Sequence, residues 1–137
     1  MKFLNARYAY VALRIVSGLL FCCHGAQKLF GAFGGQHATS GLPMVAGPIE
    51  FIAGLMIAFG LWAGIAAFIA SGEMAVAYFM VHFPMGPVPI ENHGELAVVY
   101  CFLFLYIASI GSGAFSLERA FRHRSERSPA HHGELPV

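Results

Sequence analysis

Several ionisable and amide side chains interrupt segments of the sequence that are otherwise apolar. In a setting of low dielectric constant such groups can donate hydrogen bonds to a carbonyl and relay protons, because burial and neighbouring charges shift their protonation. The candidate catalytic residues, which supply an imidazole, an ammonium and two carboxylates, are His24, Lys28, Glu50 and Glu95. The candidate cofactor-binding residues are His24, Gln27, His82 and Asn92.

The composition indicates that these residues lie in a membrane protein. Of the 137 residues, 58% are hydrophobic and only 11% are charged, whereas a typical soluble domain carries about 25% charged residues. The formal net charge is +1 with histidine neutral, so no strong field attracts a polyanion. These values exclude a nucleic-acid-binding protein, a disordered chain and a soluble enzyme with a charged surface, and the length leaves room for one domain.

Four apolar segments predict four helices that cross a membrane. Each is close to the roughly 20 residues needed to span the hydrocarbon core, where backbone polar groups must be bonded within the segment. We therefore expect an all-α, integral membrane four-helix bundle over residues 1–118. The helices are expected at about residues 8–30, 45–61, 63–83 and 95–114.

The connections between these helices differ in character. Residues 31–44 are rich in Gly, Ser and Thr, which predicts an irregular loop. The turn at Trp62 is tight, so the second and third helices form an antiparallel hairpin. The three prolines of residues 83–89 exclude a regular helix there. Because this segment is also apolar, we expect it to pack over the helix ends.

The basic residues predict the orientation in the membrane. Lys2 and Arg7 flank the first helix, and residues 119–137 form a basic tail. We expect this tail to begin as a short helix capped by Ser116 and to be disordered beyond Ser125. An even number of spans puts both termini on one side, and the excess of Lys and Arg makes that side cytoplasmic. The predicted topology is N-in/C-in, with the irregular loops on the outer side.

Depth along the predicted helices groups the polar residues. Charged groups inside a membrane cost a few kcal/mol each, so they usually face the bundle and find partners. All four helices bring polar groups to the same outer third of the membrane, and we expect a shared chamber formed by His24, Lys28, Glu50, His82 and Glu95. Arg14 and Glu73 lie deeper. We expect these two residues to form a structural ion pair, because either charge alone would be costly.

Metal and thiol chemistry receive little support from the spacing of possible ligands. No HExxH or CxxC pattern is present, so we expect no metal site. Cys22, Cys23 and Cys101 are expected to be small core residues. A redox pair between Cys23 and Cys101 is the alternative.

Four stretches spread along the chain resemble motifs of one family. They are His24-Gly-Ala-Gln-Lys-Leu-Phe-Gly31, Gly47-Pro-Ile-Glu-Phe51, Ser71-Gly-Glu-Met-Ala-Val-Ala-Tyr-Phe79 and Asn92-His-Gly-Glu-Leu-Ala-Val-Val-Tyr-Cys-Phe102. In their order and spacing they resemble the DoxX family of small bacterial membrane proteins, over about residues 8–118. The resemblance implies a four-helix membrane bundle. It also implies a link to redox systems, since DoxD-like relatives are associated with thiosulfate:quinone oxidoreductase and some DoxX-like relatives with thiol or oxidative-stress complexes.

Functions of different classes fit these observations. In the first, the chain is a redox-linked, quinone- or thiol-associated subunit of the bacterial inner membrane. A quinone head group would enter from the bilayer, His24 or Lys28 would donate to its carbonyl, and Glu50 or Glu95 would relay protons. Because the sequence shows no recognisable electron carrier, a partner subunit would supply one.

In the second class the chain is a non-catalytic assembly or anchoring module, within a homo-oligomer or beside a partner subunit, whose polar cluster only fixes the helices. Passage of a small molecule or a proton is a further alternative.

Overall fold

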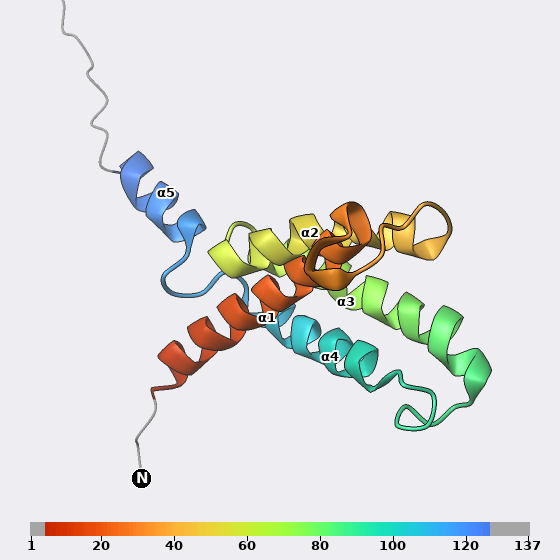
Figure 1. The fold of residues 1–137 in the computed structure, drawn as a ribbon. Coiled ribbons are helices and arrows are strands. Elements are labelled where there is room, and N and C mark those ends of the chain that lie inside the picture. Colours follow the sequence, from red (N-terminus) through yellow and green to blue (C-terminus); the bar gives the residue numbers. More distant parts are fainter. Residues whose placement is uncertain (1–4, 127–137) are drawn as a thin grey trace, which may run out of the picture.

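Five helices make up most of the chain that the structure describes, residues 5–126. In this computed structural model, four apolar helices run side by side as a bundle and a fifth projects from one end (Figure 1). They are α1 (Ala6–Phe30), α2 (Leu42–Phe59), α3 (Ala63–Ala77), α4 (Glu95–Ile110) and α5 (Leu117–Glu126). The all-α class is confirmed, since residues 5–126 contain no β-strand. Most of the segment expected to be disordered lies outside the described residues.

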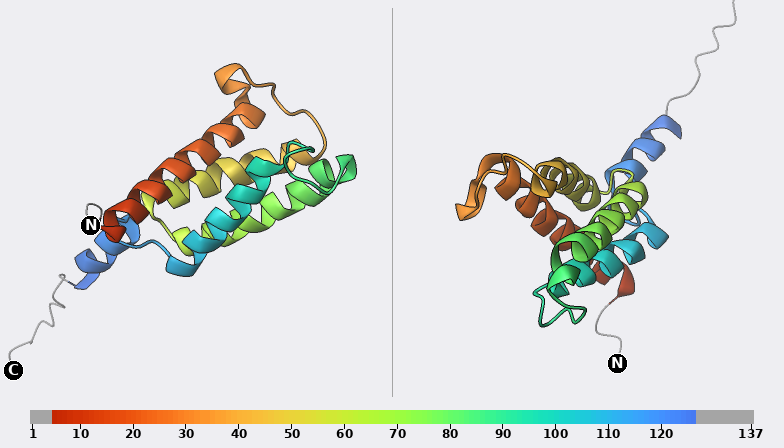
Figure 2. Two further views of the ribbon diagram at one scale, coloured as in Figure 1. Left: turned by 90° about the horizontal axis from the view of Figure 1, so that it is seen from below. Right: turned by 90° about the vertical axis from the view of Figure 1, so that its right-hand side faces the viewer.

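The bundle has two unlike ends. At one of them the start of α1, the turn between α2 and α3, and the end of α4 lie near α5 (Figure 2), and we name it the α5 end. At the other, named the loop end, α1 continues into the short helix η1 (Ala32–Gly34) and an irregular loop. Here α3 also continues, through a π-helical turn, η2 (Tyr78–His82), and η3 (Phe83–Met85) into the proline-rich loop.

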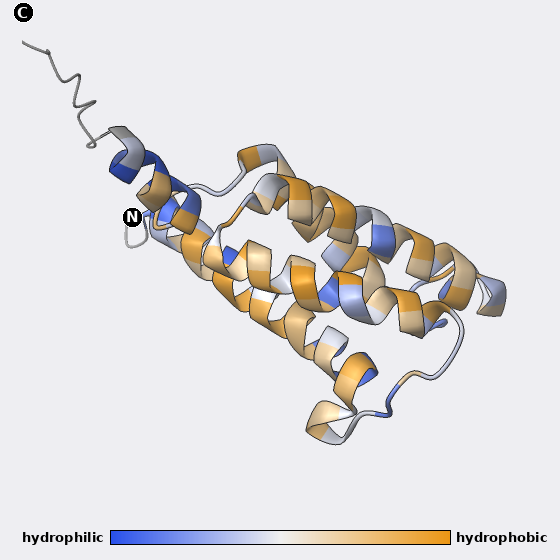
Figure 3. Cartoon of the chain, turned by 90° about the horizontal axis from the view of Figure 1, so that it is seen from above, coloured by the Kyte–Doolittle hydropathy of each residue, from blue (hydrophilic) through white to orange (hydrophobic). Residues whose placement is uncertain are grey.

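Within the described residues, three helices are long and apolar enough to cross a membrane. They are α1 with 25 residues, α2 with 18 residues, and α3 together with its extension, with 23 residues. α4 is shorter, with 16 residues. It ends at Ile110 rather than at the expected residue 114, because Gly111 adopts a φ of 79°. α2 begins at Leu42 rather than at residue 45, because Pro43 suits a first helical turn. Figure 3 shows the apolar bundle beside the mainly hydrophilic α5.

Glycines bring α1 and α2 into backbone contact. A Cβ atom at Gly18 would lie 2.7 Å from the carbonyl oxygen of Gly54, and one at Gly54 would lie 2.5 Å from the nitrogen of Cys22. Farther along, a Cβ atom at Gly25 would lie 2.7 Å from the carbonyl oxygen of Gly47. Small residues let helix backbones approach this closely in a membrane. The relative position of α1 and α2 is therefore fixed at two points.

Aromatic rings join this helix pair to α3 and α4. The ring centroid of Phe21 on α1 lies 4.7 Å from that of Phe104 and 5.6 Å from that of Tyr100, both on α4. From α3, Ala67 and Ala70 are fully buried in the same core. The small side chains of α3 leave room for the large rings of α4, so that all four helices share one core.

Arg14 is buried at the α5 end, and the expected ion pair with Glu73 is wrong. The Arg14 guanidinium donates to the carbonyl oxygens of Ser112 and Phe115, the second at 3.0 Å. A longer contact of 3.5 Å joins it to the Ala58 carbonyl. Ala58 is in the last turn of α2 and Ser112 follows the end of α4, where helices carry partial negative charge. Carbonyl dipoles therefore compensate the arginine, and no carboxylate within residues 5–125 pairs with it.

Replacing Gly54 by alanine should destabilise the bundle, because the new Cβ would meet backbone atoms of α1. Such overpacking typically costs about 1–3 kcal/mol. Gly72 on α3 is the matched control, since nothing lies within 4 Å of a Cβ placed there. G72A should therefore leave the stability unchanged or raise it. Thermal unfolding in detergent measures both variants, and equal midpoints would contradict the close contact of α1 with α2.

Candidate functional site

An ion pair joins α1 and α2 near the loop end. The Lys28 ammonium donates to Oε1 of Glu50, whose side chain is only 2% exposed, whereas the Lys28 side chain is 30% exposed. Lys28 lies in the last turn of α1, and the approach of Gly25 to Gly47 brings the two helices together beside it. A buried carboxylate is costly unless a cation compensates it. Lys28 supplies that cation, and its own position is thereby fixed.

Glu73 of α3 belongs to the same cluster. Its carboxylate interacts electrostatically with Glu50 and Lys28, and its Oε2 atom is buried with no hydrogen-bond partner among the described residues. Glu50 lies ten residues before Gly60 and Glu73 lies ten residues after Ala63, so the tight turn between the helices puts both carboxylates at one level. The prediction that Glu73 lies apart from the cluster is wrong. That prediction counted the depth of Glu73 from the loop end of α3, where the extension of the helix is irregular.

His24 of α1 and Tyr100 of α4 complete this group. His24 interacts electrostatically with Glu50, and its ring lies edge-to-face on Tyr100 with 6.3 Å between the centroids. Tyr100 is 6% exposed and also interacts with Glu50. The sequence patterns did not identify Tyr100 as a site residue. The only feature that could have indicated it was a phenol within an apolar segment. We name this group, with members from four helices, the Glu50 cluster: His24, Lys28, Glu50, Glu73 and Tyr100.

A groove between α2 and α3 reaches the Glu50 cluster. Its volume is about 370 Å³, and its charged lining residues are Lys28 and Glu73. The remaining lining is apolar and includes Leu42, Val45, Ile69 and Val76. Those four side chains are exposed at the surface of the bundle. The groove therefore opens at the side of the helices, where lipid surrounds a membrane protein, and it places a cation and a carboxyl group among apolar walls.

His82 ends the π-helical turn and Asn92 lies in the loop before α4, both apart from the Glu50 cluster. Asn92 is 1% exposed; its side chain donates to the Gly86 carbonyl at 2.6 Å and accepts from the Gly94 N–H at 2.8 Å. Nδ1 of His82 lies 3.0 Å from the Asn92 carbonyl oxygen, and the His82 ring stacks on Tyr78. These contacts hold the loop against the π-helical turn, so both residues are engaged in local structure rather than brought to the cluster.

Glu95 and Gln27 also lie outside the cluster. Glu95 is exposed as the first residue of α4, where a negative charge is favourable beside the helix N-terminus. Gln27 is half-buried and close to the loop after α1, since a Cβ at Gly35 would lie 2.7 Å from the Gln27 Cβ. Of the four candidate catalytic residues, the structure brings together His24, Lys28 and Glu50 but not Glu95.

The cysteines are free thiols on α1 and α4. Cys22 is buried, and Sγ of Cys101 lies 3.6 Å from the Ser71 hydroxyl. The same hydroxyl donates to the Cys101 carbonyl at 2.8 Å, which links α3 to α4. No disulfide joins Cys23 to Cys101. Over residues 5–126, no group of three or more His, Cys, Asp or Glu side chains is placed to hold a metal ion.

Removing one or the other partner of the Lys28–Glu50 pair should have unequal effects. Lys28→Met leaves an unpaired carboxylate on a side chain that is 2% exposed, whereas Glu50→Gln leaves an ammonium on a side chain that is 30% exposed and can extend to water. Breaking a buried pair costs about 3–5 kcal/mol. We expect K28M to approach that loss and E50Q to lose less. Thermal unfolding in detergent measures the difference, and a loss for E50Q equal to that of K28M would contradict this asymmetry.

Comparison with known proteins identifies the family. The model of the DoxX family matches residues 9–83, a range that holds His24, Lys28, Glu50 and Glu73. An uncharacterized protein of Haemophilus influenzae is 41% identical over 122 residues, which cover 83% of this chain and 91% of that protein. No solved structure matches the chain significantly. Because the family match spans more than half of the sequence and contains most of α1 and the whole of α2 and α3, this chain belongs to the DoxX family.

Proposed function

We propose that this DoxX-family protein is a redox-linked membrane subunit that binds the head group of a lipid-soluble quinone between α2 and α3. One observation carries the proposal: an apolar groove open at the side of the bundle reaches Lys28 and Glu73. Because the sequence shows no recognisable electron carrier of its own, the electrons come from a partner subunit that holds the redox cofactor.

The size and the polarity of the groove support a ring with an apolar tail. Its volume of about 370 Å³ lies within the range of small-molecule sites, roughly 300–1,000 Å³. The tail lies along exposed apolar side chains such as Val45, Ile69 and Val76, while the ring carbonyls meet the polar residues. Apart from Lys28 and Glu73, the lining is apolar, which favours a quinone with its apolar tail over a small polar thiol as the ligand.

The charged residues have separate roles in this proposal. The Lys28 ammonium, held in place by Glu50, donates a hydrogen bond to a ring carbonyl. Glu73, whose Oε2 has no partner within residues 5–126, exchanges protons with the ring as electrons from the partner subunit reduce it. His24, beside Glu50, is a second group able to pass protons toward the ring. Glu50 is a positioning residue, because it acts through Lys28.

We infer that the α5 end faces the cytoplasm of a bacterial inner membrane. The exposed arginines at this end, within the described residues, are Arg7 on α1 and Arg119, Arg122 and Arg124 on α5. At the loop end, in contrast, the Lys28 charge is paired with Glu50. Lysine and arginine accumulate on the cytoplasmic side of membrane proteins, and the relative from Haemophilus influenzae is bacterial. In this orientation the termini are N-in/C-in, and the groove opens in the outer half of the membrane.

Glu73→Leu should weaken the binding of quinone analogues roughly tenfold, because it removes the hydrogen bond that the protonated Glu73 carboxyl group donates to a ring oxygen. Glu95→Leu is the matched control, since it makes the same change at an exposed position outside the groove. A ubiquinone or menaquinone analogue at a hundred times its Kd stabilises a folded protein by about 2.7 kcal/mol. Thermal unfolding in detergent at increasing analogue concentration gives the affinity of each variant.

Quinone binding is contradicted if no analogue raises the unfolding temperature of the wild-type protein. That result would favour a non-catalytic assembly or anchoring module. If the analogues stabilise the wild type, but Glu73→Leu and Glu95→Leu respond alike, the quinone binds somewhere other than the groove.

A further inference from the structure

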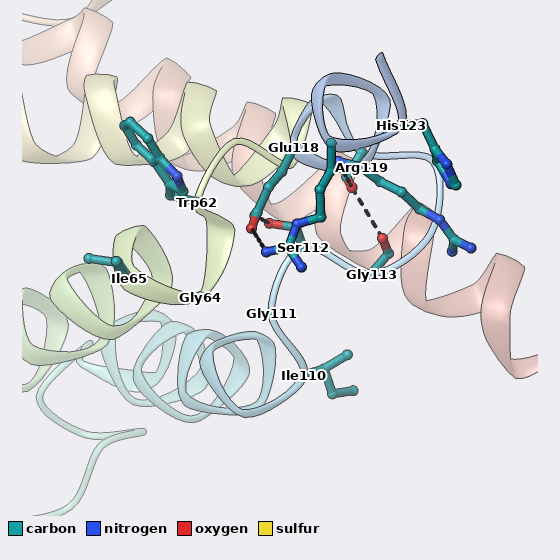
Figure 4. A pocket seen from close by; sticks show the side chains of 12 residues that line it. Trp62, Gly64, Ile65, Ile110, Gly111, Ser112, Gly113, Glu118, Arg119 and His123 are labelled. Carbon is teal, nitrogen blue, oxygen red and sulfur yellow. Dashed lines mark hydrogen bonds and ion pairs between the residues drawn. The ribbon is translucent and has the colours of Figure 1, made fainter. Parts of the chain in front are cut away.

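A second pocket lies at the α5 end of the bundle, opposite the loop end (Figure 4). It has a volume of about 540 Å³ and lies between the α2–α3 turn, the end of α4 and the first turns of α5. Trp62 and Ile65 line one side, and Arg119 and His123 line the side formed by α5. None of these residues belongs to the proposed quinone site.

The wall of this pocket toward the bundle is apolar. Trp62, Ile65 and Ile110 are 59%, 66% and 45% exposed. All three belong to the ends of the apolar helices or to the turn between them. The apolar wall therefore continues onto the side of the bundle that lipid chains cover. Tryptophan is enriched at this level of membrane proteins, where its ring meets both the headgroups and the chains.

The wall formed by α5 is basic. The only carboxylate that lines the pocket within the described residues is that of Glu118, which accepts from the Ser112 hydroxyl at 2.5 Å and lies 3.7 Å from the Arg122 guanidinium. This negative charge is therefore engaged within the wall. Arg119 is exposed, and no carboxylate within residues 5–125 pairs with it. Guanidinium groups bind phosphate oxygens through paired N–H donors.

The sequence of α5 suits a helix that lies on a membrane surface. Leu117 and Phe121 are four residues apart on one helical face and are 42% and 60% exposed. Phe115, just before the helix, is 62% exposed. Basic amphipathic helices lie in the interface with their apolar face at the boundary between headgroups and chains. This position puts Arg119 and Arg122 at the level of the lipid phosphates.

We propose that this pocket binds the headgroup phosphate of an anionic phospholipid. Arg119 and Arg122 contact the phosphate, and the acyl chains lie along Trp62, Ile65 and Ile110. We assign a lipid rather than a free phosphate ion because one wall of the pocket is apolar. A free phosphate ion would leave that wall without a ligand. The proposal goes beyond the quinone site and does not depend on it, nor on which side of the membrane is cytoplasmic.

Trp62 is the only tryptophan in the sequence, so its fluorescence reports on this pocket. The whole chain is reconstituted into phosphatidylcholine vesicles that contain a brominated phospholipid, because bromine quenches tryptophan fluorescence on contact. Brominated phosphatidylglycerol is compared with brominated phosphatidylcholine at equal mole fraction, for the wild type, R119Q and R124Q. R124Q is the matched control, since it removes the same charge from the same helix at a residue that does not line the pocket.

We expect phosphatidylglycerol to quench Trp62 more strongly than phosphatidylcholine in the wild type. R119Q removes a guanidinium that contacts the phosphate, so it should lower the relative affinity for phosphatidylglycerol roughly tenfold. R124Q should lower it less, because Arg124 adds only to the general attraction of a basic surface for anionic lipid. Both arginines are exposed, so the variants should fold like the wild type, which circular dichroism verifies.

Equal quenching by the two lipids in the wild type would overturn the proposal. An equal effect of R119Q and R124Q would also overturn it, because the attraction would then come from the whole basic surface of α5 rather than from the pocket. Inorganic phosphate is added as a separate arm. Recovery of Trp62 fluorescence on its addition would show a site for a free anion and would contradict the assignment to a lipid.

Discussion

The backbone contact between α1 and α2 constrains the position of every charged group in the bundle. Because the two helices touch through glycines, they can neither rotate nor slide without steric conflict. Lys28 follows Gly25 by three residues and Glu50 follows Gly47 by three residues, so one approach of the backbones brings this cation and this carboxylate together. At the other end, the same helix pair places Arg14 beside the final turn of α2.

Charged groups in the bundle are compensated in different ways. This difference distinguishes the residues that stabilise the fold from the residue that is available to a ligand. Arg14 is held by carbonyl groups at helix ends, and Lys28 and Glu50 compensate each other. Oε2 of Glu73 is buried without a hydrogen-bond partner within the described residues, as are Oε2 of Glu50 and Nε of Arg14. Glu73, however, is in no ion pair there and lines a groove that opens at the side of the bundle. A buried carboxyl oxygen without a partner is costly. Glu73 is therefore the group whose presence a ligand explains best.

Hydropathy and helix periodicity were sufficient to predict the helical class, the approximate helix positions and the grouping of His24, Lys28 and Glu50. They were not sufficient for Glu73, because the partners of a helical residue depend on how far each helix extends at its irregular end. The π-helical turn after α3 displaces that end, whereas counting from the tight α2–α3 turn gives the correct level. For Arg14, backbone carbonyls at helix ends can satisfy a guanidinium, and they leave no pattern in the sequence.

Photo-crosslinking tests most directly whether the groove between α2 and α3 receives a quinone from the lipid. The protein in vesicles is irradiated with an azido-quinone, and the crosslinked residues are identified by mass spectrometry. We predict crosslinks at Val45, Ile69 and Val76 that an excess of unmodified quinone prevents. Crosslinks confined to the groove between α1 and α4, which Val16 and Val99 line, or crosslinks that unmodified quinone does not prevent, would contradict the proposed site.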